Sequence, residues 1–123
     1  MPDGPYVVCV VSRPDADHVR QLRTHLEARL PNVTVEVLAD AERCRERVED
    51  GGVDAVLTEY ALPNGTGARL ATVLSGSAPT LPVVLLSERT TPEIVDDAHG
   101  APIAAFVQRE SDGSTYLAAA ALE

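Results

Sequence analysis

The sequence predicts an α/β fold in which a five-stranded parallel sheet carries helices on both faces. Apolar or alternating segments of strand length alternate five times with helical patterns along the 123 residues. Such alternation is typical of βαβ units joined by right-handed crossovers. The length suits one domain, which we place over residues 1–123, and 45% apolar residues are enough for its core.

The first half of the chain contains two strand–helix pairs. The run YVVCVV at 6–11 is rich in β-branched residues, as in a strand that is buried on both faces. Asp15 is placed to cap a helix. Apolar residues then recur at helical spacing, at Val19, Leu22, Leu26 and Leu30. The alternating segment 33–37 predicts a half-buried edge strand, and Asp40 caps a short helix at 41–49.

The second half repeats the alternation three times. Strands are predicted at 53–58, 81–86 and 103–107, and helices at 68–74, 92–100 and 111–119. Between the first of these strands and its helix lies EYALPNGTG, a loop rich in Pro and Gly. Because the carboxyl ends of parallel strands meet at one edge of the sheet, we expect the functional residues there.

The charge and the cysteines exclude several function classes. Nineteen acidic residues oppose ten Arg, with no Lys, for a net charge of −9. This predicts no nucleic-acid binding, and no segment is long and apolar enough for a membrane, so we expect a cytoplasmic domain. The acid excess favours a halophilic, haloarchaeal source over a GC-rich genome alone. Cys9 is expected as a buried hydrophobic residue, and Cys44 as buried or a free thiol, without a zinc or redox motif.

The segment VDAVLTEYALPNGTGARL resembles the receiver domain of response regulators in two-component systems, the CheY-like domains. The resemblance rests on Asp54 before the strand, Glu59 after it, Leu62-Pro63 in the loop and Gly67 before the next helix. It implies a flavodoxin-like fold with strand order 2-1-3-4-5. It also implies a signalling module that is not an enzyme, cut from a longer signalling protein.

The resemblance further implies a set of site positions, several of which are altered. Receiver domains phosphorylate an Asp after the third strand, bind Mg²⁺ through an acidic pair after the first, and use a Ser or Thr after the fourth and a Lys after the fifth. Here those positions hold Glu59, Ser12 with Arg13, Ser87 and Arg109, while Phe106 stands at the switch aromatic. Without the acidic pair we expect no metal and no cofactor, because Mg²⁺ prefers carboxylate oxygens.

These substitutions predict a degenerate receiver that no longer accepts phosphate by the usual route. We expect an internal ion pair from Glu59 to Arg109, to Arg13 or to both, because Arg and carboxylate groups can pair through two hydrogen bonds. Such a module would bind a sensor kinase or an output domain. A homodimer through the fourth helix, fifth strand and fifth helix is a further expectation.

Two alternatives stay open on the sequence. One is a working receiver that accepts phosphate on Glu59 or on a displaced Asp, with Asp15 holding Mg²⁺. The other is a flavodoxin-like domain that binds a small molecule, which would need a pocket at the ends of the strands.

Overall fold

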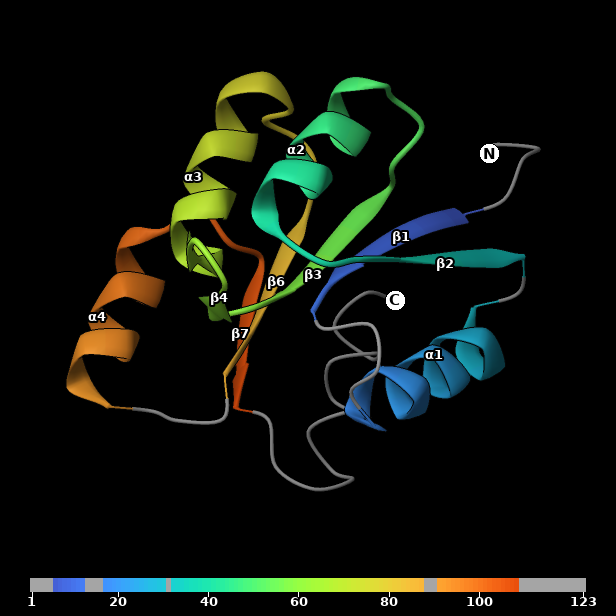
Figure 1. Cartoon of the computed structure of the whole chain (residues 1–123), viewed down its shortest axis with the longest axis horizontal. Coiled ribbons are helices and arrows are strands. Elements are labelled where there is room, and N and C mark those ends of the chain that lie inside the picture. Colours follow the sequence, from blue (N-terminus) through green and yellow to red (C-terminus); the bar gives the residue numbers. More distant parts are fainter. Residues whose placement is uncertain (1–5, 13–16, 31, 88–90, 109–123) are drawn as a thin grey trace.

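A five-stranded parallel sheet forms the centre of the protein (Figure 1). The structure is a computed structural model and describes residues 6–12, 17–30, 32–87 and 91–108. The sheet has the order β2-β1-β3-β6-β7. Its strands are β1 (Tyr6–Val11), β2 (Val33–Leu38), β3 (Ala55–Glu59), β6 (Val83–Ser87) and β7 (Ala105–Gln108). The predicted parallel sheet and its order 2-1-3-4-5 are therefore confirmed, with β6 and β7 as the fourth and fifth strands.

Helices cover both faces of this sheet, as predicted. Figure 1 shows α1 on one side and the other three helices on the opposite side. The helices are α1 (Asp17–Arg29), α2 (Ala41–Glu49), α3 (Gly67–Ser77) and α4 (Pro92–Gly100). The helix predicted at 111–119 lies outside the described residues.

Alternate residues of β1 build the two halves of the core. Val8 and Val10 pack on the α1 side with Leu22 and Leu26. The residues between them point to the other face, where Cys9 and its neighbours meet α2 and α3. Burial on both faces explains why this strand is apolar at every position.

Helix caps confirm two of the predicted helix starts. The Asp40 carboxylate accepts a hydrogen bond of 2.9 Å from the Arg43 amide and so begins α2. Thr91 caps α4, in which Pro92 takes the first position, where its missing N–H costs nothing. The proposed cap of α1, Asp15, lies outside the described residues.

Several predicted boundaries were wrong around the third strand. This strand begins at Ala55, not at residue 53, and the Asp54 carboxylate instead accepts a hydrogen bond of 2.7 Å from the Val7 amide on β1. The loop at 59–67 contains a small antiparallel hairpin, β4 (Ala61–Leu62) with β5 (Gly65–Thr66). The following helix, predicted at 68–74, extends over 67–77 because Thr66 caps it one residue earlier and its apolar positions continue to Leu74. The predicted strands 81–86 and 103–107 begin two residues later than expected.

Two arginines of α2 form ion pairs, one within the helix and one with the edge strand. Arg45 binds Glu42 and lies 2.6 Å from Glu49 on the same helix. Arg47 reaches across to Glu36 on β2, with nitrogen–oxygen distances of 2.8 and 3.1 Å. This second pair fixes the end of α2 to the edge strand β2.

Both cysteines are free thiols in the core. Cys9 and Cys44 are both fully buried. This confirms the prediction of a buried Cys9, and it shows that Cys44, for which burial had been left open, is a buried free thiol. Burial raises the pKa of the Cys9 thiol to about 11 and that of Cys44 to about 12. Within the described residues, no helix has the length and apolar character needed to cross a membrane.

Candidate functional site

Three of the predicted site residues lie on adjacent strands at the carboxyl edge of the sheet. Val11 pairs with Thr58, so Ser12 and Glu59 follow side by side at the ends of β1 and β3. Glu59 is in register with Leu86, and Ser87 comes one residue later at the end of β6. The topology therefore places one carboxylate and two hydroxyl groups at the same edge of the sheet, although Ser12 and Ser87 are 75 residues apart in the chain.

The two serines are more deeply placed than the glutamate. Ser12 and Ser87 each expose only 5% of their surface, whereas Glu59 is half-buried. The hydroxyl of the fully buried Thr58 donates to the carbonyl of Glu59 at 3.0 Å. The backbone at this strand end is thus held by a side-chain hydrogen bond, while Glu59 itself is less buried than the two serines.

Gly67 is required by close packing behind this edge. Its amide donates to the Tyr60 carbonyl at 2.7 Å. A Cβ atom at this position would lie 2.3 Å from the Glu59 carbonyl oxygen and 2.7 Å from a methyl carbon of Leu85. Helix α3 can therefore begin against the end of β3 only with a glycine here, which accounts for the glycine in the sequence pattern.

Phe106 lies in β7, in register with Leu85. Its ring is half-buried in a small cluster that α3, β6 and α4 build from Ala68, Leu85 and Ala98. The prediction of Phe106 as a switch aromatic is untested, but its position next to the buried strand β6 is compatible with that role.

Tyr60 is a site residue that sequence reasoning missed. It packs against the same cluster as Phe106, and its hydroxyl donates to the carboxylate of Asp97 on α4. This hydrogen bond and the burial, together with the negative charges of Asp97 and Glu93, raise the pKa of the Tyr60 phenol. The available signal was that Tyr60, directly after Glu59, is the one aromatic residue of the loop at 59–67.

The cationic positions of the predicted site lie outside the described residues. Arg13 directly follows Ser12, and Arg109 directly follows the last residue of β7. The ion pair from Glu59 to either arginine therefore stays a prediction, as does a metal role for Asp15. Within the described part of the chain, no three His, Cys, Asp or Glu side chains are grouped so that they could hold a metal ion.

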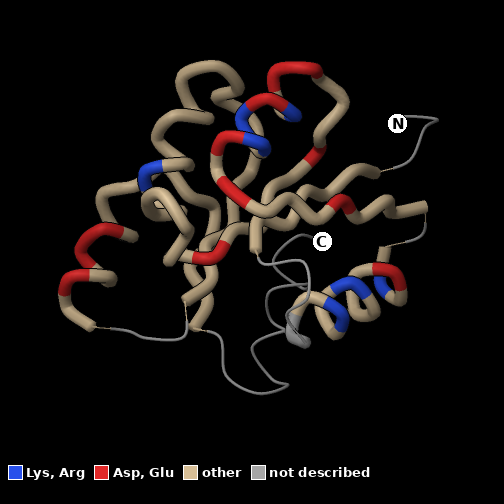
Figure 2. The backbone as a smooth tube through the Cα atoms, in the orientation of Figure 1, with Lys and Arg blue, Asp and Glu red and all other residues tan. Residues whose placement is uncertain are grey.

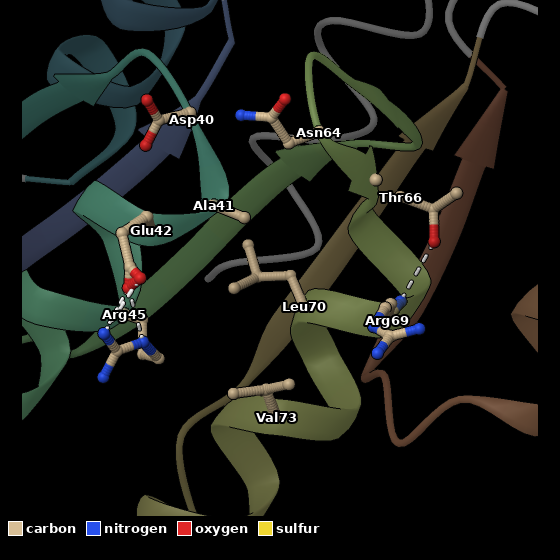
Figure 3. Close-up of a pocket in the computed structure, with 10 residues that line it drawn as sticks. Asp40, Ala41, Glu42, Arg45, Asn64, Thr66, Arg69, Leu70 and Val73 are labelled. Atoms are coloured by element: carbon tan, nitrogen blue, oxygen red, sulfur yellow. Dashed lines mark hydrogen bonds and ion pairs between the residues drawn. The ribbon is translucent and has the colours of Figure 1, made fainter.

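A separate groove of about 230 Å³ lies between α2 and α3 (Figure 3). Leu70 and Val73 line it on the α3 side, and Arg45 lines it from α2. The groove includes none of the predicted site residues, and its volume is below the roughly 300–1,000 Å³ of small-molecule sites. It therefore gives little support to the small-molecule alternative.

Comparisons with known proteins agree with this geometry. The model of the response regulator receiver domain family matches residues 12–121. No curated protein matches the chain in sequence.

Solved structures of receiver domains are similar to this chain in fold. A CheY-like response regulator receiver domain protein from Methanospirillum hungatei is 16% identical, with a TM-score of 0.76 over 89% of this chain and 85% of that one. The signal receiver domain of an HD domain-containing protein from Pseudomonas fluorescens is 19% identical, with a TM-score of 0.72 over 88% and 77%. The phosphorylated cyanobacterial phytochrome response regulator RcpA is 14% identical, with a TM-score of 0.79 over 97% and 89%. With the family model covering most of its length, this chain belongs to the response regulator receiver domain family of two-component systems.

Proposed function

We propose that this domain is a receiver that regulates a protein partner without ordinary aspartate phosphorylation. The observation that carries the proposal is the residue set at the ends of β1, β3 and β6, which is Ser12, Glu59 and Ser87. Ser87 supplies the hydroxyl that a receiver uses, whereas the acceptor Asp and the first residue of the acidic pair are replaced. The chain acts as a binding module in this proposal and not as an enzyme.

The donor set at these strand ends does not fit Mg²⁺. Mg²⁺ requires near-octahedral oxygen ligands and is usually held through one or two carboxylates plus substrate phosphates. Ser12 is a neutral hydroxyl, and the next residue in the sequence, Arg13, is a cation. Glu59 is then the one carboxylate among the three described residues, and we assign no step of the function to a metal.

Glu59 also alters the geometry of the acceptor position. Its carboxylate stands one methylene further from the backbone than that of an aspartate, in the region that a phosphoryl group on aspartate would occupy. The sequence keeps a cation, Arg109, where receivers have Lys. We propose that the Glu59 carboxylate, paired with Arg109 or Arg13, takes the place of phosphate as a fixed negative group, because Arg favours paired carboxylate contacts.

The partner is proposed to bind at α4 and β7. Over 92–108 this face carries Glu93, Asp96 and Asp97 and no Lys or Arg (Figure 2). A basic protein surface complements this charge, whereas two copies related by a two-fold axis would bring carboxylates against carboxylates. We therefore favour a basic surface of a kinase or output domain over the homodimer.

The test is the intact mass of the protein after incubation with acetyl phosphate and Mg²⁺ in high salt. The wild type is expected to gain no phosphoryl group. A variant with Ser12→Asp, Arg13→Asp and Glu59→Asp is expected to gain one. Circular dichroism of both proteins checks that the buried substitution at Ser12 leaves the fold intact.

Phosphorylation of the wild type would contradict the proposal and favour the working receiver. Loss of that phosphorylation in Glu59→Gln would then identify Glu59 as the acceptor, and its persistence would point to a displaced aspartate such as Asp15. If a folded triple variant also gains no phosphoryl group, the substitutions at the strand ends are not what blocks the reaction, and the proposal fails on that ground.

A further inference from the structure

The backbone of Tyr60 is hydrogen-bonded at the edge of the sheet where Glu59 lies. It directly follows Glu59, and its amide donates to the Leu86 carbonyl on β6 at 2.6 Å. Its carbonyl accepts the hydrogen bond from the Gly67 amide at the start of α3. The backbone of Tyr60 is therefore held on two sides, so that a displacement at the end of β3 has to displace Tyr60 as well.

The side chain of Tyr60 extends from this point to α4. The ring packs against the cluster that contains Ala98 of α4 and Phe106 of β7. The hydroxyl donates to the Asp97 carboxylate, one residue before Ala98 and 37 residues away in the sequence. A hydrogen bond with an ionised acceptor is roughly twice as strong as a neutral one.

Helix α4 has few other attachments to the sheet. Among its nine residues only Ala98 is buried, whereas α3 buries five residues over eleven. Ile94 and Val95 are half-buried. Elements that bury few apolar side chains open most readily. We therefore expect even a solvent-exposed hydrogen bond such as that of Tyr60 to Asp97 to contribute measurably to holding α4 in place.

We propose that Tyr60 is the positioning residue that couples the Glu59 end of β3 to helix α4 through its hydrogen bond to Asp97. The hydrogen bond from Tyr60 to Asp97 is part of the described structure. Only the use of this coupling in signalling, through the partner face on α4, rests on the proposed function.

Amide hydrogen exchange, followed by mass spectrometry on peptides of α4, α2 and α3, tests the link. Tyr60→Phe removes the hydroxyl and keeps the ring, and we expect exchange in 92–100 to become about twofold to tenfold faster, as for one lost hydrogen bond. Exchange in α2 and in the second half of α3 should stay unchanged. Asp97→Asn should give a smaller increase, because the amide oxygen still accepts a hydrogen bond without the charge.

Asp96→Asn is the matched control. It makes the same change of charge and helix propensity one residue earlier on α4, where no hydrogen bond to Tyr60 is formed. Exchange that is equally fast in Asp96→Asn and Asp97→Asn, or equal acceleration of α2, α3 and α4 in Tyr60→Phe, would overturn the proposal. An additive Tyr60→Phe/Asp97→Asn double variant would do so as well, because the two groups would then act independently.

Coupling to the site is tested by Glu59→Gln in two backgrounds. In the wild type it should change exchange in α4 by at least about twofold, and with Tyr60→Phe this effect should be lost. Equal effects in both backgrounds, or none in the wild type, would overturn the coupling. The acetyl phosphate experiment decides the proposed function separately, since the exchange data do not depend on whether the wild type accepts phosphate.

A spectroscopic measurement distinguishes this link from a general effect on stability. The hydrogen bond to Asp97, then burial and the negative charges of Asp97 and Glu93, raise the pKa of the Tyr60 phenol above its usual value. Asp97→Asn should therefore lower the midpoint of the Tyr60 absorbance titration, isolated as the difference from Tyr60→Phe, while Asp96→Asn should not. An unchanged midpoint in Asp97→Asn would contradict the hydrogen bond.

Discussion

Two glycines of α3 provide a sharp test of how the helix is seated against the site. Gly67 begins the helix and Gly76 lies in its last turn. A Cβ atom at Gly67 would come within 2.3 Å of the Glu59 carbonyl oxygen, whereas ordinary contact begins at 3.4 Å. In Gly67→Ala the carbonyl or the helix must therefore move by about 1 Å, against a strand that is buried on both faces.

The cost of that movement can be estimated. Overpacking in a core typically costs about 1–3 kcal/mol, and contact with backbone instead of a flexible side chain places Gly67→Ala at the upper end. Alanine also loses less backbone freedom on folding than glycine, which returns about 0.4–1 kcal/mol. We predict a net loss of about 2 kcal/mol in the free energy of unfolding for Gly67→Ala.

Gly76→Ala is the matched control within the same helix. Gly76 is exposed, and a Cβ atom there would meet no atom within 4 Å. The substitution only reduces the freedom of the unfolded chain, so we predict a gain of about 0.4–1 kcal/mol.

Urea unfolding followed by circular dichroism measures both changes. The slope of unfolding free energy against urea should be equal in all three proteins, so that the midpoints report stability. If Gly67→Ala lies within about 0.5 kcal/mol of the wild type, or if both variants shift in the same direction, the close approach of α3 to Glu59 is refuted.

Three further predictions concern contacts away from the site. Arg47→Met should cost about 1–2 kcal/mol in unfolding free energy, because the pair with Glu36 is half-buried. The pKa of Glu36 is lowered by its hydrogen bond to Arg47, so this difference should be present above about pH 4.3 and disappear on acidification in a urea series. Cys9 and Cys44, with pKa values of about 11 and about 12, should react with a water-soluble aromatic disulfide only after unfolding, and reaction in the native protein would contradict their burial. Asp54→Ala should cost about 1–3 kcal/mol by leaving an amide of β1 without its acceptor, with Asp54→Asn closer to the wild type in the same urea assay.

The fold could be predicted because each strand and helix has an apolar pattern that can be recognised within its own segment. The apolar run at 6–11 predicts the buried strand, and the spacing of Val19, Leu22 and Leu26 predicts the buried face of the first helix. Neither prediction requires knowledge of the other segments. Once the strands are parallel, topology alone brings Ser12 and Glu59 to the same edge of the sheet. Both predictions needed only periodicity and the direction of the strands.

The missed features depend on contacts between distant segments. The Tyr60–Asp97 hydrogen bond joins a loop to a helix residue 37 positions away, and neither residue type predicts which partner it will bind. Asp54 was expected to mark the start of a strand, but its carboxylate accepts a hydrogen bond from the Val7 amide of β1. The turn of the short hairpin β4–β5 is formed by Pro63 and Asn64, and Gly65 follows it with a φ of 159°. Local propensity carries too little information for such features.

The distribution of stabilising contacts explains how a receiver fold can carry an altered site. The two larger core clusters are built from apolar residues of the strands and of α1, α2 and α3, and they do not include Ser12, Glu59 or Ser87. Under the proposed function, an acidic pair is exchanged for other residues at the strand ends, and we expect that exchange to leave the packing of these clusters intact. The contacts that connect this edge to α4 are those of Tyr60 and of the cluster around Phe106. If both proposals hold, a domain of this kind loses phosphoryl transfer and still transmits a change at the end of β3 to the surface that a partner would contact, as long as the hydrogen bond to Asp97 persists.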